Sequence, residues 1–339
     1  MLAGLVTMNG GLIGCVAPCR WVGESDGDQY LDSGARCSRI VARRTGPLAR
    51  GVLRYQNVGV VLLATVAGLV VPLPAWSTRV VTPIVVLLIY GSFRDLSFDN
   101  TGLEFVALTV GGLVVTYTLS PVIAVVVGQH LLSRDALLGV VIMAAGPTTA
   151  GSALVWTRLD GGETALTASI ALATLVLAPV VVPGVLMVLV IESVSLALWP
   201  IIEDLLTIVL GGAGLLLLLP NERIDGDSLD TVFLLAIGVL VFVSVGAHNL
   251  QGIPLGLVGG IGVTALVLIG SLLVVMAAAR RLWNLPPERT RSVFFSTALK
   301  NLGVALVVAR MVGAGDITLA IIECYIIQQI VAGFVVGAR

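Results

Sequence analysis

The feature that most constrains this chain is an uncharged stretch at residues 231–279, which contains no Asp, Glu, Lys or Arg over 49 residues. A helix that crosses the hydrocarbon core of a bilayer needs about 20 residues, so the stretch is long enough for two crossings. The segment His248–Pro254 contains Asn, Gln, Gly and Pro, which favour turns, and we predict that the chain reverses direction there.

The composition of the whole chain agrees with a location in the bilayer. Of its 339 residues, 57% are hydrophobic and 12% are charged, whereas a soluble domain carries about 25% charged residues. The formal net charge of −1 offers no basic field for nucleic acid. Cys15 and Cys19 lie in a region without His, so we predict no metal site there. These properties predict an all-α integral membrane protein.

The charges divide the chain into an N-terminal segment and a series of apolar segments. Residues 1–55 hold an acidic patch followed by clustered arginines, and we predict that this segment is poorly structured. Residues 57–339 form a predicted domain of about ten transmembrane helices. These helices are predicted at residues 57–75, 78–93, 103–129, 136–157, 164–190, 201–219, 231–248, 254–279, 292–312 and 315–337.

The distribution of arginine indicates the orientation of the helices. With the N-terminus in the cytoplasm, fifteen arginines fall in cytoplasmic loops and termini, and three, Arg79, Arg134 and Arg310, fall outside. Cytoplasmic loops of membrane proteins usually carry such an excess. We therefore predict both termini in the cytoplasm and a location in the cytoplasmic (inner or plasma) membrane. Glu203 and Asp204 flank a predicted outer loop, where they are either solvated or part of a gate.

The fourth predicted helix contains a sequence that disfavours a continuous helix. Gly146-Pro147-Thr148-Thr149-Ala150-Gly151-Ser152 combines a proline, two glycines and three hydroxyl residues. Proline lacks an amide donor and clashes with the preceding turn. Backbone groups freed inside a bilayer need partners, so we predict that a break here lines a cavity or an ion site. An ordinary proline kink satisfied by neighbouring helices is the alternative.

The ninth predicted helix carries the chain's single lysine, Lys300, followed by Asn301. Both lie about ten residues into an apolar segment. A cationic side chain near the middle of a bilayer costs about 2.5–3.5 kcal/mol on insertion scales, so it should face the protein interior or water. The alternative is an interfacial position in which Lys300 reaches a lipid headgroup.

The two interrupted helices occupy matching places, since each is the fourth of five consecutive helices. Because five is odd, the two halves would have opposite orientations, which makes them inverted repeats. Inverted repeats with paired discontinuous helices are typical of secondary transporters. The N-termini of half-helices carry partial positive charge and free amides, which favour an anionic ligand. The pattern therefore predicts a transporter of anions.

At these two segments the chain resembles the bile acid:sodium symporter family. Gly146–Ser152 is similar to that family's Pro-Gly-Gly-Thr-Ala-Ser-Asn, and Leu299–Gly303 is similar to its Met-Gln-Asn-Ser-Gly. The spacing from Ala165 to Pro183 resembles its fifth helix. The resemblance implies that the discontinuous fourth and ninth helices cross in a core domain, with substrate between the core and a panel domain. The core would comprise residues 103–190 and 254–337, and the panel residues 57–93 and 201–248.

The chain departs from the family where the resemblance implies two sodium sites. The family's ninth-helix glutamate falls at Ser296, and its glutamine falls at Lys300. Thr116 replaces a glutamine, Ser152 replaces an asparagine, and Thr167 keeps an oxygen. We hypothesise that Lys300 takes the place of one sodium ion, so that transport is proton-linked or uncoupled. Sodium therefore stays an open question, and no other cofactor is predicted.

The predicted function is transport of a small organic anion such as pyruvate or pantoate. Bile-acid-like sterols are less favoured because only 5% of the residues are aromatic. The polar atoms of Tyr325, Gln328 and Gln329 in the tenth helix are either satisfied inside the bundle or line the substrate path. The predicted substrate- and ion-binding residues are Lys300, Asn301, Ser296, Thr297, Pro147, Thr148, Thr149, Ser152, Thr167 and Thr116.

Arsenite efflux and a sensor or scaffold role are the alternative functions, and an enzyme is not predicted. Pro147-Thr148-Thr149-Ala150 also resembles, more weakly, the Pro-Cys-Thr-Ala of arsenite efflux permeases, but Thr148 replaces the thiol that arsenite binds. A membrane sensor or scaffold that transports nothing is the other alternative. An enzyme is not predicted, because the only histidines, His130 and His248, lie in loops and no HExxH motif occurs.

Overall fold

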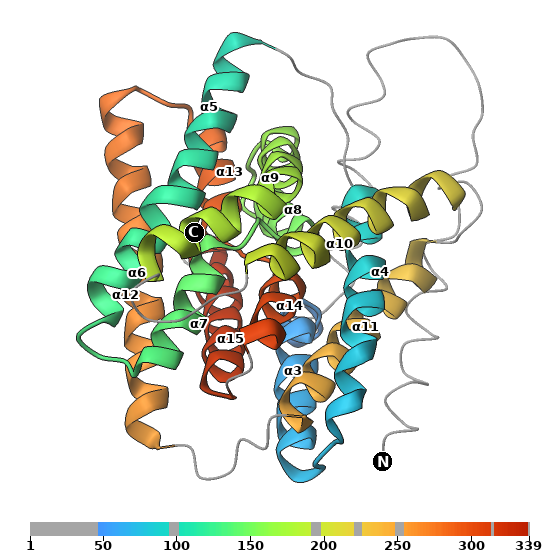
Figure 1. Ribbon diagram of the computed structural model, residues 1–339. Helices are drawn as coiled ribbons and strands as arrows, with labels where there is room; N and C mark the ends of the chain where they lie inside the picture. The colour runs from blue at the N-terminus through green and yellow to red at the C-terminus, as the bar shows by residue number, and fades with distance from the viewer. Residues whose placement is uncertain are drawn as a thin grey trace, which may run out of the picture. The chain divides into compact units, whose positions relative to one another are not determined.

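The computed structural model describes residues 47–94, 102–190, 198–219, 226–247, 254–312 and 315–337. Within these ranges every regular element is a helix (Figure 1). The first helix, α3 (Pro47–Val70), begins before the predicted boundary at residue 55, so the last residues of the segment predicted as poorly structured are helical. The rest of that prediction, residues 1–46, lies outside the described residues.

Each predicted transmembrane segment coincides with one helix or with a run of consecutive helices. The remaining elements are η1 (Ala75–Val80), α4 (Val81–Arg94), α5 (Leu103–Val114), η2 (Val115–Leu119), α6 (Ser120–Gly128), α7 (Arg134–Ala145), α8 (Ala150–Leu159), α9 (Thr164–Val190), α10 (Leu198–Leu218), α11 (Gly226–Gly246), α12 (Leu255–Leu282), α13 (Pro287–Ala298), α14 (Leu302–Val312) and α15 (Gly315–Gly337).

Six helical segments of the described chain have the length and composition to cross a membrane. Three others, Val58–Val70, Thr231–Gly246 and Leu302–Val312, are apolar but shorter. An integral membrane protein built of helices is therefore confirmed, whereas ten crossings arranged as inverted repeats stay a prediction. The six segments are Trp76–Arg94, Leu103–Gly128, Thr164–Leu189, Trp199–Leu218, Leu255–Leu282 and Gly315–Val336.

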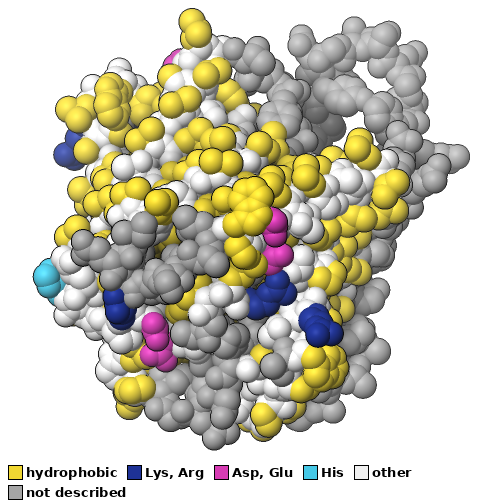
Figure 2. All heavy atoms as spheres, viewed as in Figure 1, with side chains coloured by type: hydrophobic (Ala, Val, Ile, Leu, Met, Phe, Trp, Pro, Cys, Tyr) yellow, Lys and Arg dark blue, Asp and Glu magenta, His cyan; other side chains and the backbone are white. Residues whose placement is uncertain are grey.

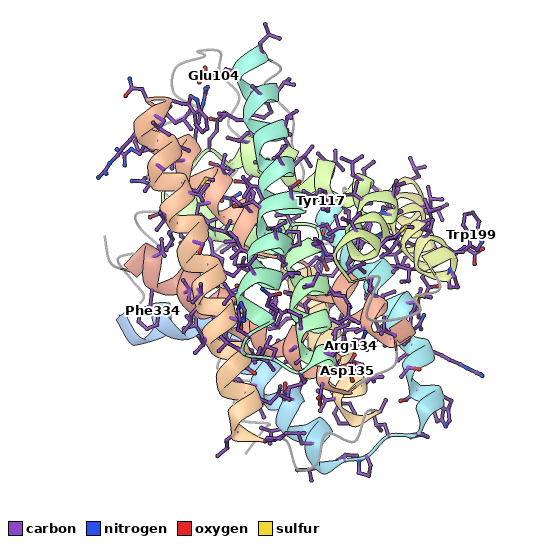
Figure 3. The ribbon with its side chains drawn as sticks, turned by 60° about the vertical axis from the view of Figure 1, so that its left-hand side comes forward. Glu104, Tyr117, Arg134, Asp135, Trp199 and Phe334 are labelled. Atoms are coloured by element: carbon purple, nitrogen blue, oxygen red, sulfur yellow. The ribbon has the colours of Figure 1, made fainter. Side chains whose placement is uncertain are left out.

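The surface of these helices is apolar in the way that a lipid environment requires. Figure 2 shows hydrophobic side chains spread over the face in view, with charged side chains in a few small groups. Trp199 and Phe334 are 67% and 68% exposed, and both lie at the periphery in Figure 3. Leaving such side chains in water would forfeit about 1.5–3 kcal/mol each, so contact with lipid accounts for them.

Two helices that the sequence predicts to be interrupted are interrupted. The fourth predicted helix is divided into α7 and α8, and the ninth into α13 and α14. α7 ends at Ala145, and its C-cap residue Gly146 has an extended backbone, with φ −61° and ψ 153°. The residue before a proline is disfavoured in the helical region, so Pro147 fixes the end of α7.

The third predicted helix is continuous in direction but changes its hydrogen bonding. Between α5 and α6 lies η2, a π-helical turn in which the Ser120 amide donates to the Val115 carbonyl, five residues earlier. Pro121, which has no amide to donate, follows directly and removes one ordinary helical bond. The predicted helix at 103–129 is therefore present, but it contains an unpredicted π turn, which presents Thr116 and Tyr117 to the interior.

The packing between helices places the two interrupted ones centrally. α7 packs on α15 and α6, α13 packs on α12 and α9, and α14 contacts α15, α10 and α4. α4 in turn packs on α10 and α11, and these three helices are seen together in Figure 1. The breaks in both helices are thereby enclosed by neighbouring helices.

Candidate functional site

The two breaks cross and hydrogen-bond to each other. Thr148 and Lys300 form an isolated antiparallel β-bridge. The Thr149 amide donates to the Leu299 carbonyl at 3.1 Å, and the Asn301 amide donates to the Pro147 carbonyl at 2.8 Å. Each break therefore supplies the partners that the other lacks inside the membrane, which is how irregular backbone survives there.

Neighbouring helices hold the crossing in place through Thr148. Its hydroxyl donates to the Ser296 carbonyl at 2.5 Å, and its amide donates to Thr174 Oγ1 at 3.1 Å. The Tyr117 hydroxyl of the π turn donates to the carbonyl of Thr174. Thr174 was not predicted as a site residue, although it lies seven residues after Thr167 on the same face of α9.

Lys300 lies in the protein interior, as predicted, and not at a lipid headgroup. Its side chain is 1% exposed, and its backbone amide donates to Gln328 Oε1 at 3.1 Å. Its Nζ has no hydrogen-bond partner among the described residues, and neither has the buried Oγ1 of Thr116. Two polar groups that would each cost about 1–3 kcal/mol unpaired are thus enclosed in the interior.

Several predicted ion-binding hydroxyls are committed to bonds inside the protein. Ser296 Oγ donates to the Ser292 carbonyl at 2.7 Å, and Thr297 Oγ1 donates to the Val293 carbonyl at 2.8 Å. Thr167 Oγ1 lies 3.0 Å from Thr157 Oγ1. The described residues hold no group of three His, Cys, Asp or Glu side chains that could bind a metal ion.

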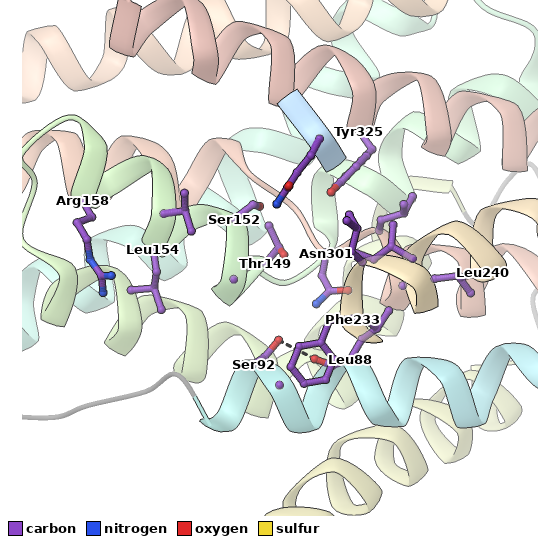
Figure 4. Close-up of a pocket in the computed structure, with 18 residues that line it drawn as sticks. Leu88, Ser92, Thr149, Ser152, Leu154, Arg158, Phe233, Leu240, Asn301 and Tyr325 are labelled. Carbon is purple, nitrogen blue, oxygen red and sulfur yellow. Dashed lines mark hydrogen bonds between the residues drawn. The ribbon is translucent and has the colours of Figure 1, made fainter. Parts of the chain in front are cut away.

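A cleft of about 420 Å³ opens beside the crossing (Figure 4). Residues of α3, α4, α8, α11, α14 and α15 line it. Of the ten predicted site residues, Thr149, Ser152 and Asn301 line the cleft, and the other seven do not. Lys300 belongs to the second group, so the structure separates the buried amine from the open cavity.

Two helix N-termini line the cleft. Thr149 is the N-cap residue of α8, and its side chain makes no capping hydrogen bond. Asn301 precedes α14, and its Oδ1 accepts a 3.1 Å bond from the Val304 amide. The first turn of each helix, represented by Gly151 and Gly303, lines the cavity. First-turn amides lack helical acceptors and carry the positive end of the helix dipole, which favours oxygen atoms of an anion.

A buried side-chain network supports the cleft behind Ser152. Trp156 Nε1 donates to Gln329 Oε1 at 2.9 Å, and Gln329 Nε2 donates to Ser152 Oγ at 3.1 Å. Because Ser152 Oγ accepts this bond, its own proton is available to a ligand. Gln328 and Gln329 therefore satisfy buried partners, while Tyr325 lines the cleft. The sequence left both roles open for all three residues.

The far end of α14 is held by an ion pair. Arg310 Nη2 lies 2.5 Å from Asp204 Oδ2 of α10, and Arg310 Nη1 donates to the Thr78 carbonyl of η1 at 3.1 Å. Both charged side chains are about three-quarters buried. Arg310 lies seven residues beyond Gly303, roughly 10 Å along the helix, and neither residue of the ion pair lines the cleft.

Comparison with known families agrees with this geometry. The profile of the Sodium Bile acid symporter family matches residues 82–249. Over these residues the chain is similar to this family. The matched region includes the first break and α8 to α11, and it ends before the ninth predicted helix. No curated protein matches the chain. Members of the sodium bile acid symporter family are membrane transporters and not enzymes, in agreement with the predicted class.

Proposed function

We propose that this protein is a secondary transporter that moves a small organic anion through the cleft beside the crossed helices. The observation that carries the proposal is the crossing itself, because two broken helices bond to each other and direct their N-termini into one cavity. Paired discontinuous helices with substrate at their N-termini are typical of secondary transporters.

The chemistry of the cleft supports an anionic substrate. Its described lining includes no Asp or Glu, while Ser152, Thr149 and Asn301 supply hydrogen-bond donors beside the two helix N-termini. Its volume of about 420 Å³ lies near the lower end of ligand pockets, which span about 300–1,000 Å³. These properties favour a small carboxylate, of the size of pyruvate or pantoate, over a sterol.

The buried amine of Lys300 supports transport without sodium at one of the family's ion sites. Lys300 occupies the crossing, where a bound cation would otherwise offset the partial charges of unwound carbonyls. An ammonium group at this point supplies the positive charge from the chain itself. We infer that transport is proton-linked or uncoupled, with the Lys300 amine, which has no hydrogen-bond partner among the described residues, in the place of one ion.

The positions of the cleft and of the ion pair between Arg310 and Asp204 support alternating access. In the proposed topology, ten helices form two inverted repeats, both termini are cytoplasmic, and the cleft opens to the cytoplasmic side. The ion pair between Arg310 and Asp204 then lies on the outer side, where it closes the path. α8, α14 and α15 belong to the proposed core, and α3, α4 and α11 belong to the proposed panel, so the cleft separates the two.

The test is uptake of labelled pantoate and pyruvate into proteoliposomes, with an inward sodium gradient and with sodium replaced by choline. We expect uptake of at least one of the two acids, unchanged when sodium is replaced. Sodium-stimulated uptake would contradict the role of Lys300, and absence of uptake of both acids would contradict the proposed transport of a small carboxylate. Protein-free liposomes provide the background.

The described residues favour neither arsenite efflux nor a membrane sensor. The described lining of the cleft contains no cysteine for arsenite, and Thr148, which stands where a permease has its thiol, is buried and bonded to Ser296. A sensor would need no cavity beside crossed helix breaks. Transport is therefore the function that we propose.

A further inference from the structure

One charged residue among those lining the cleft has no role in the function described so far. Arg158, in the last turn of α8, is the single charged residue of the described lining. It follows Gly151, Leu154 and Val155 at helical spacing, and all four line the cavity, so this face of α8 forms one wall. Figure 4 shows Arg158 on α8 away from Thr149 and Asn301, with Leu154 beside it.

The acidic residues close to Arg158 in sequence are paired with other arginines. Asp160 Oδ2 lies 3.6 Å from Arg291 Nε, and Glu163 Oε2 lies 3.0 Å from Arg289 Nε. Arg289 also pairs with Glu104 of α5 at 2.5 Å. Within the described part of the chain, the guanidinium of Arg158 itself makes no ion pair or hydrogen bond.

The cleft therefore presents one exposed guanidinium and no carboxylate among its described residues. A guanidinium offers two parallel N–H donors that match a carboxylate, and charge-assisted bonds of this kind are stronger than neutral ones. Arg158 lies six residues after Ser152, roughly 9 Å along α8. A carboxylate at Arg158 thus leaves the first turns of α8 and α14 for neutral oxygen atoms of the same molecule.

We propose that Arg158 binds the carboxylate of the transported anion. The substrate class is then an organic acid whose carboxylate pairs with Arg158, whose apolar part packs on Leu154, and whose hydroxyl or carbonyl oxygens meet Ser152 and Asn301. This inference rests on the proposed transport function and extends it, because it assigns the anion-binding residue to α8 and not to the buried Lys300.

The proposal predicts that removing the charge of Arg158 weakens substrate binding and that a new positive charge at this position restores it. In a background with Cys15, Cys19 and Cys37 replaced by serine and the buried Cys324 kept, we expect Arg158→Cys to raise the KM for labelled pantoate roughly tenfold or more. Treatment with 2-aminoethyl methanethiosulfonate, which adds a positive charge, should restore most of the affinity. The sulfonatoethyl reagent, which adds a negative charge, should weaken uptake further.

A matched control distinguishes substrate binding by Arg158 from the general effect of replacing an arginine and modifying the cysteine. Arg280 is an exposed arginine in the last turn of α12 and does not line the cleft. Arg280→Cys should keep the KM of the background protein before and after either reagent. Equal unfolding temperatures of the two cysteine variants show that Arg158→Cys folds as the background does.

Equilibrium binding of labelled pantoate and pyruvate to detergent-solubilised protein, measured in parallel, distinguishes the two proposals. Uptake by the background protein with an unchanged KM in Arg158→Cys would overturn the role of Arg158 and leave transport intact. Binding that depends on Arg158, without uptake, would overturn transport and support the residue assignment. Neither binding nor uptake by the background protein would overturn both.

Discussion

At the scale of single residues, the most unusual group is the amine of Lys300, enclosed at the crossing without a hydrogen-bond partner among the described residues. We expect Lys300→Gln to make uptake sodium-dependent, because an amide oxygen replaces the ammonium that occupies the ion's place. Lys300→Met has similar bulk but no oxygen, so its uptake should stay indifferent to sodium. Initial uptake rates over a sodium titration check both variants, and sodium dependence of the unaltered protein would contradict the hypothesis.

Gln329 gives a second prediction at this scale, because it bridges Trp156 and Ser152 inside the bundle. Gln329→Leu removes the hydrogen bonds to Trp156 Nε1 and Ser152 Oγ, and the loss of one such bond costs about 0.5–1.5 kcal/mol. We expect a lower unfolding temperature and a higher KM, since Ser152 loses the bond that orients its hydroxyl. Gln129, which is exposed, provides the control. An unchanged KM in Gln329→Leu would mean that Ser152 does not contact the substrate.

The residue scale also shows what the sequence could predict. Lys300 stands out because a cation is costly in an apolar segment, and Pro147 because it lies among glycines and hydroxyl residues, so both were found from the local sequence. Arg158 was counted among the cytoplasmic loop arginines, because its place on a cavity wall depends on tertiary packing. Thr174 carried no local signal beyond its spacing from Thr167, and its bond to Thr148 spans 26 residues.

At the scale of elements, α14 begins with a cap that also faces the cleft. Asn301 Oδ1 accepts from the Val304 amide, and substitution of an N-cap residue by alanine costs about 0.5–2 kcal/mol. Aspartate caps helices as well as asparagine does. Asn301→Asp should therefore keep the stability of the protein but lower anion uptake strongly, because it adds a negative charge to the cavity.

The measurement compares thermal unfolding and uptake for Asn301→Asp and Asn301→Ala. We expect the alanine variant to lose both stability and uptake, and the aspartate variant to lose uptake alone. Equal uptake by the aspartate variant and the unaltered protein would show that the N-terminus of α14 does not face the anion.

The elements themselves divide into those that the sequence predicts and those that it does not. Hydrophobic length located the helices, and the combination of Gly146 and Pro147 located the break between α7 and α8. The π turn at η2 was missed because a proline that follows a serine is also compatible with an ordinary helix. A cavity at the break between core and panel was predicted, but its lining residues from α3, α4 and α11 were not, because they are uncharged and carry no motif.

At the scale of the whole molecule, alternating access requires that α14 and α10 separate where Arg310 and Asp204 now meet. We predict that joining these positions stops transport. In the cysteine-replaced background, Asp204→Cys combined with Arg310→Cys and a short bifunctional thiosulfonate should abolish uptake of pantoate, and reduction of the crosslinker should restore it. The uncrosslinked double variant gives the reference rate, since it has already lost the ion pair.

A second ion pair provides the control for this crosslink, because the proposed domains place it within the core. Arg289 of α13 pairs with Glu163, which precedes α9 directly. If the core moves as one body, the same reagent on Arg289→Cys with Glu163→Cys should leave the uptake rate within about twofold of its uncrosslinked value. Full uptake with the Asp204 and Arg310 positions joined would show that this end of the molecule stays closed throughout transport. Loss of uptake in both crosslinked proteins would place a moving boundary inside the proposed core, between α13 and α9.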